Sequence, residues 1–101
     1  MSLLVAFSVA PATADDSGSV SEAVAAAVRV VRESGLPHET NAMFTNVEGE
    51  WDEVMAVVKA ATMAVAKHSS RVSLVLKADL REGHSDALHA KVASVERHLA
   101  G

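Results

Sequence analysis

LLVAFSVA, residues 3–10, is the stretch of sequence that decides the fold. It is an apolar run of strand length that contains Val and Phe, which is typical of a β-strand covered on both faces. Alternation along a strand gives two sets of side chains: Leu3, Val5, Phe7 and Val9 on one side, and Leu4, Ala6, Ser8 and Ala10 on the other. A strand with two apolar faces belongs in the middle of a sheet.

Helical patterns follow this strand at three places. Residues 19–34 open with the capping box Ser19-Val20-Ser21-Glu22, and Gly35 stands where a helix C-terminus favours glycine. A second helix begins in the acidic stretch at 48–53 and carries an apolar stripe. A third begins near Ser85, with Leu88, Val92, Val95 and Leu99 at helical spacing.

Strands separate these helices. Residues 36–49 fit two short strands with a turn near Asn41, and residues 71–81 fit a last strand. The order β-α-β-β-α-β-α predicts one α+β domain over residues 1–101. Its core is a ferredoxin-like βαββαβ unit with a four-stranded antiparallel sheet, followed by an additional C-terminal helix.

The second face of this sheet needs a cover. A lone ferredoxin-like sheet exposes one face to water, yet that side of residues 3–10 is mostly apolar. On the last strand, Lys77 and Asp79 share a face, which is either a solvated surface or the margin of an interface. Either the third helix folds back over the face or a second subunit covers it, and we favour a homo-oligomer.

Composition excludes several classes of function. The net charge of −4 argues against a basic nucleic-acid footprint, and the absence of cysteine excludes disulfides and thiolate metal sites. No apolar stretch is long enough to span a bilayer, and residues 1–11 lack the basic start of a signal peptide, so we expect a cytoplasmic protein without membrane contact.

Catalytic and metal sites lack their patterns. The five histidines have no metal-ligand spacing, and no nucleophile motif or phosphate loop is present. The acidic cluster at 48–53 is explained by a helix N-terminus, and Trp51 lies in the apolar stripe of its helix, which predicts a core position. We therefore expect no enzyme, no metal and no cofactor.

Two hydroxyls stand out against this background. Ser8 lies within the most apolar strand, and Thr45 lies in the hairpin strand expected beside it. Each could simply bond nearby backbone. Alternatively the two could converge, and small polar groups converging in an apolar pocket suit a small-molecule site.

Three motifs taken together resemble the small thiamine-binding proteins, the YkoF-like family. They are FSVAP at residues 7–11, TNVEGEWDEV at residues 45–54 and KADLR at residues 77–81. The resemblance covers essentially the whole chain. It implies a ferredoxin-like fold, a homotetramer of paired dimers, no catalytic activity, and thiamine or its hydroxymethylpyrimidine part as ligand.

The resemblance also implies site residues. Ser8 and Thr45 match strand positions whose hydroxyls face the pyrimidine, and Lys77 and Asp79 match polar positions of the last strand. Phe44 stands where the family often has a small residue, so its ring either walls the pocket or fills it. The sequence thus favours an oligomeric carrier or sensor of a small heteroaromatic molecule. The alternative is an oligomeric structural or regulatory protein without a ligand.

Overall fold

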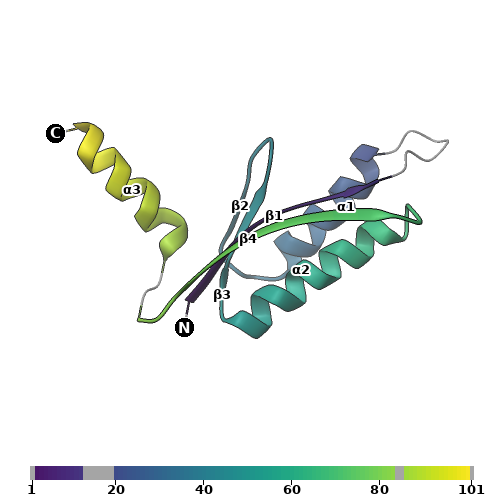
Figure 1. The fold of residues 1–101 in the computed structure, drawn as a ribbon, viewed down its shortest axis with the longest axis horizontal. Coiled ribbons are helices and arrows are strands. Elements are labelled where there is room, and N and C mark those ends of the chain that lie inside the picture. Colours follow the sequence, from purple (N-terminus) through teal and green to yellow (C-terminus); the bar gives the residue numbers. More distant parts are fainter. Residues whose placement is uncertain (1, 13–19, 84–85, 101) are drawn as a thin grey trace.

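The computed structural model describes residues 2–12, 20–83 and 86–100. The elements are β1 (Ser2–Pro11), α1 (Val20–Glu33), β2 (His38–Thr40), β3 (Thr45–Gly49), α2 (Trp51–Ala66), β4 (Val72–Arg81) and α3 (Ala87–Ala100). Figure 1 shows α1 and α2 side by side on one face of the sheet, with α3 away from them. The predicted ferredoxin-like α+β order with an added C-terminal helix is confirmed.

The sheet has the order β2-β3-β1-β4, and every pair of neighbours is antiparallel. β1 and β3 are therefore the central strands, as the sequence predicted. β1 pairs with β4 over its whole length, from Ser2 to Pro11, but with β3 only from Leu3 to Phe7. One end of β1 consequently continues beyond β3.

The hydrophobic core lies between the sheet and the helix pair. Leu3, Val5, Phe7 and Val9 of β1 are all buried, which confirms the face assignment made from their alternation. Small side chains cover them: Ala23, Ala27 and Val31 from α1, and Val54, Val58, Ala61 and Val65 from α2. Because alanine and valine are short, the helices and the sheet pack closely and each contact buries modest area.

The end of α1 follows the predicted signal. Gly35 has φ 78°, a left-handed conformation that glycine adopts without strain, and Ser34 Oγ donates to the Val31 carbonyl at 2.6 Å. The capping serines predicted at Ser19 and Ser85 lie outside the described residues.

Two buried anchors attach α3 to the free face of the sheet. The Glu48 carboxylate of β3, only 4% exposed, accepts hydrogen bonds from the backbone N–H groups of Ala87 at 2.7 Å and Leu88 at 3.2 Å. The Ala87 and Leu88 side chains are buried there. A carboxylate from another strand thus satisfies the first amides of α3, the role we predicted for a local serine.

The rest of α3 projects from the sheet and the other two helices (Figure 1). The whole molecule, with α3 included, measures 51 × 30 × 20 Å. Val92, Val95 and Leu99 are 60%, 59% and 76% exposed. The third helix therefore covers only the part of the second sheet face near its own first turns.

Trp51 departs from the expectation. Its side chain is 51% exposed at the first turn of α2, so the predicted core position is wrong. The buried face of this helix begins with Val54, one turn later.

Candidate functional site

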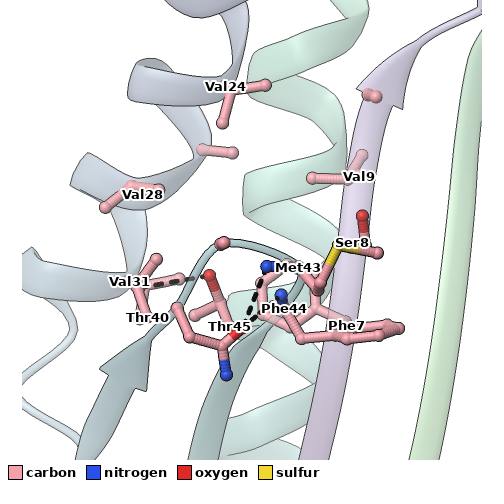
Figure 2. A pocket seen from close by; sticks show the side chains of 14 residues that line it. Phe7, Ser8, Val9, Val24, Val28, Val31, Thr40, Met43, Phe44 and Thr45 are labelled. Atoms are coloured by element: carbon pink, nitrogen blue, oxygen red, sulfur yellow. Dashed lines mark hydrogen bonds between the residues drawn. The ribbon is translucent and has the colours of Figure 1, made fainter.

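A cavity of about 200 Å³ opens where β3 begins and β1 continues past it. We call it the hairpin cavity. Residues 7–10 of β1 and residues 40–45 of the β2–β3 hairpin line it together with Val24, Ala27, Val28 and Val31 of α1. In Figure 2 the valines of α1 lie on one side, β1 lies on the other, and the hairpin closes the lower end.

The hairpin turn explains why this space is open. The Asn41 side-chain oxygen accepts the backbone N–H groups of Met43 and Phe44, each at 2.9 Å, and the Asn41 N–H donates to the Phe44 carbonyl at 2.9 Å. Asparagine commonly stabilises turns in this way. The bend at residues 42–43 ends the strand before it can pair with the remainder of β1, and a gap is left.

Thr45 brings a hydroxyl to this cavity. Its side chain is 8% exposed, and its Oγ1 lies 3.2 Å from Oγ1 of Thr40 on the neighbouring strand, with either atom able to donate (Figure 2). A paired hydroxyl still has acceptor capacity, so the two threonines can offer a ligand both a donor and an acceptor.

Ser8 also lines the cavity, but the strands do not bring its hydroxyl to that of Thr45. Thr45 is paired with Phe7 and so shares its face of the sheet. Ser8 is the next residue after Phe7 and, by alternation, its side chain lies on the other face. The two residues border the same space from different directions, without converging hydroxyls.

Phe44 lies at the rim of the cavity and is half-buried. The 200 Å³ remain open beside it. The Phe44 ring borders this open space and does not occupy all of it, and its part in ligand binding stays a prediction.

Lys77 and Asp79 lie elsewhere. They border a separate space of about 230 Å³ under α3, on the free face of the sheet, with Leu4, Ala6, Asn46 and Lys91 among its walls. Asp79 accepts a hydrogen bond from the Lys91 ammonium of α3. This bond, together with the charge of Lys91, holds the pKa of Asp79 below its usual value. Of the five residues implied by the resemblance, Ser8, Phe44 and Thr45 therefore border the hairpin cavity, whereas Lys77 and Asp79 border the separate space under α3.

Histidine and acidic side chains form no cluster of three or more that could hold a metal ion within the described ranges. His89 Nδ1 lies 2.8 Å from Oδ1 of Asp86, and this hydrogen bond raises the pKa of the exposed imidazole. His84 lies outside the described residues. No helix of the described part of the chain is long and apolar enough to cross a membrane.

Several residues of the hairpin cavity escaped the sequence analysis. Thr40, Asn41 and Met43 carry only the sequence pattern of a turn and its flanking strands, and the valines of α1 carry only that of a core face. The Asn41-Ala42 turn was the available signal, because a turn so early limits how far β3 can pair. Glu48 was attributed to the N-terminus of α2, whereas its carboxylate contacts α3.

Fold and site together define a ferredoxin-like α+β domain with a ring-sized cavity at the end of its central strand pair. The family model of the thiamine-binding protein matches residues 5–96. The chain belongs to this thiamine-binding protein family.

Relatives agree with this assignment. The UPF0045 protein Mb1933 of Mycobacterium bovis is 56% identical over 100 residues, which cover 98% of this chain and 96% of that protein. The solved structure of MJ1052 from Methanocaldococcus jannaschii has a TM-score of 0.83 at 30% identity and covers 94% of this chain and 96% of its own. A Thermotoga maritima protein, provisionally assigned to thiamine biosynthesis or salvage, has a TM-score of 0.79 at 26% identity, with coverages of 94% and 99%.

Proposed function

We propose that this protein binds a small heteroaromatic molecule without transforming it, and that the ligand is thiamine or its hydroxymethylpyrimidine part. The observation that carries the proposal is the hairpin cavity, in which apolar walls from three elements surround the hydroxyls of Thr40 and Thr45. Binding sites for small molecules combine these two features, a mostly apolar lining and a few placed polar groups.

The size of the cavity supports a single ring. Its 200 Å³ correspond to about seven water molecules at ~30 Å³ each, which is room for one substituted pyrimidine. In thiamine, the second ring would then extend from the opening. The family description and the provisional role of the Thermotoga maritima relative point to the same ligand class.

Named residues take distinct roles in this proposal. Thr45 donates to or accepts from the ring edge, Phe44 walls the opening, and Ser8 borders the β1 side. We assign Lys77 and Asp79 no part in this ring site, because they lie under α3, away from the hairpin cavity.

Calorimetric titration of the full chain with thiamine and with hydroxymethylpyrimidine tests the proposal. We expect saturable binding of one or both compounds, and about a 5- to 10-fold loss of affinity in Thr45→Val, which removes one hydroxyl and keeps the shape. Thr62→Val is the matched control, since the Thr62 hydroxyl bonds the Val58 carbonyl within α2, away from the cavity. Absence of heat from both compounds at ~1 mM, together with unchanged thermal stability, contradicts the proposal.

We also propose that the protein assembles with copies of itself, as a tetramer, through the exposed apolar stripe of α3. Val92, Val95 and Leu99 are all more than half exposed, which is unusual for three neighbours on one helix face of a soluble monomer. Light scattering should give a concentration-independent oligomer that Leu99→Asp weakens, while a monomer at all concentrations contradicts this.

The same stripe favours a second candidate function, a structural or regulatory oligomer that has no ligand. Calorimetry and light scattering separate the two candidates. Assembly without any binding of thiamine or hydroxymethylpyrimidine supports the second, and saturable binding that Thr45→Val weakens supports the first.

A further inference from the structure

The edge of β1 beyond the hairpin carries backbone groups that β3 does not pair. β1 pairs with β4 as far as Pro11, but its pairing with β3 ends at Phe7–Thr45. Figure 1 shows β1 and β4 continuing side by side past the short strands. Residues 8–11 are thus paired with a neighbouring strand on the β4 edge only.

One hydrogen bond fixes which residues of β1 point to the open edge. The Ala12 N–H donates to the Arg71 carbonyl at 2.8 Å, so Ala12 directs its backbone groups toward the β4 side. In an antiparallel strand the N–H and C=O of one residue point to the same edge, and successive residues point to opposite edges. Ala10 and Ser8 therefore also face β4, whereas Val9 faces the edge where β3 has stopped.

The other side of the sheet gives an independent check. The Glu48 N–H donates to the Pro37 carbonyl at 3.0 Å, so Glu48 faces β2. By the same alternation Thr45 faces β1, where its partner is Phe7. Val9 is two residues beyond Phe7 on this same edge. Pro11, the next residue on that edge, has no N–H to offer.

The hairpin cavity occupies the place of the missing partner. Continuing the register would put Met43 opposite Val9, but Met43 is in the bend and its side chain is 72% exposed. Val9 is among the residues that line the cavity, and its side chain is 7% exposed. Among the described residues, no strand pairs with this edge of Val9, and a sheltered backbone pair without a partner is costly.

We propose that the backbone N–H and C=O of Val9 bind the edge of a ring that has an amino group next to a ring nitrogen. The inference rests on the proposed function and names the chemistry that the same cavity selects. The amino group donates to the Val9 carbonyl, and the ring nitrogen accepts the Val9 N–H. A flat ring bound this way takes the position of the next residue of β3, as added strands do at open sheet edges.

This arrangement makes the polarity of the ring edge decisive. Replacing the amino group by an oxo group turns the donor into an acceptor, and the adjacent ring nitrogen acquires a hydrogen and becomes a donor. An acceptor of the ring then faces the Val9 carbonyl, and a donor of the ring faces the Val9 N–H. Sites built to hydrogen-bond a group reject the analogue strongly, because their own polar atoms stay unpaired.

The experiment compares hydroxymethylpyrimidine with its oxo analogue on the ¹⁵N-labelled full chain. We expect roughly tenfold to hundredfold weaker binding of the oxo analogue. The Val9 amide should shift on binding and exchange more slowly with solvent. The amide of Val5 is the internal control, because it lies inside the β1–β3 ladder opposite Val47 and should not respond.

Thr45→Val tests whether the Val9 backbone or the Thr45 side chain causes the preference for the amino compound. In this variant the preference for the amino compound should persist, although both affinities fall. Equal binding of the two compounds, a silent Val9 amide, or a preference lost in Thr45→Val would each overturn the inference while the proposed function stands. Failure of both compounds to bind would instead contradict the proposed function.

Discussion

Glu48 gives the sharpest test of how the fold is held together. Its buried carboxylate accepts hydrogen bonds from the amides of Ala87 and Leu88 and from the Ser2 hydroxyl, the last at 2.9 Å. Glu48→Gln keeps the size of the side chain but removes the charge. It also replaces one acceptor oxygen by an NH₂ group that faces a backbone N–H or the serine.

The magnitude follows from these contacts. Hydrogen bonds to a charged acceptor contribute roughly 1.5–3 kcal/mol each, but burying a carboxylate costs several kcal/mol in return. Loss of a helix N-cap alone typically costs about 1 kcal/mol. We therefore expect Glu48→Gln to lower the free energy of unfolding by about 2 kcal/mol, and to loosen α3 before the rest of the domain.

Urea unfolding measures the first effect, and hydrogen exchange at the amides of Lys91 and Val92 measures the second. Glu96→Gln is the matched control, because Glu96 is exposed on the same helix and its change should stay within about 0.5 kcal/mol. If Glu48→Gln unfolds like the wild type and exchange in α3 is unaltered, Glu48 does not anchor this helix.

Three further predictions concern titration and the core. The pKa of His89, measured by NMR titration, should exceed the ordinary 6.5 and should fall in Asp86→Asn. Because the folded-state pKa is raised, this pair stabilises the fold below pH 6.5, and its contribution is lost as the pH rises through the raised pKa. The pKa of Asp79 is shifted in the opposite direction, so the contribution of this carboxylate to stability is present above its ordinary pKa of 3.8 and is lost as the pH falls through the lowered value. Lys91→Gln should return the measured pKa of Asp79 toward 3.8. Leu3→Ala, at a side chain with no exposure, should cost about 3 kcal/mol by urea unfolding, and a loss below about 1 kcal/mol would contradict its place in the core.

The strands show what a pattern can reveal. The burial of Leu3, Val5, Phe7 and Val9 followed from alternation because both neighbours of a central strand are hydrogen-bonded to it and one face meets the helices. The neighbouring position of β3 followed from topology.

The site was only partly predictable for a related reason. Whether Thr45 faces the side of Phe7 or that of Ser8 depends on the register, and a shift of one residue reverses every side chain. β1 and β3 lie far apart in the chain, so no connecting turn fixes the register between them. Long-range side-chain contacts are equally hard to predict from the sequence. The hydrogen bond between Glu48 and the start of α3 joins residues 39 positions apart, and no periodic pattern in the sequence indicates it.

Chemical-shift mapping of the ¹⁵N-labelled chain with hydroxymethylpyrimidine tests the central claim most directly. The account predicts that the shifted amides cluster at residues 7–10 and 40–45, around the hairpin cavity. No shifts at ~1 mM ligand, or shifts confined to the surroundings of Lys77 and Asp79 under α3, would contradict it.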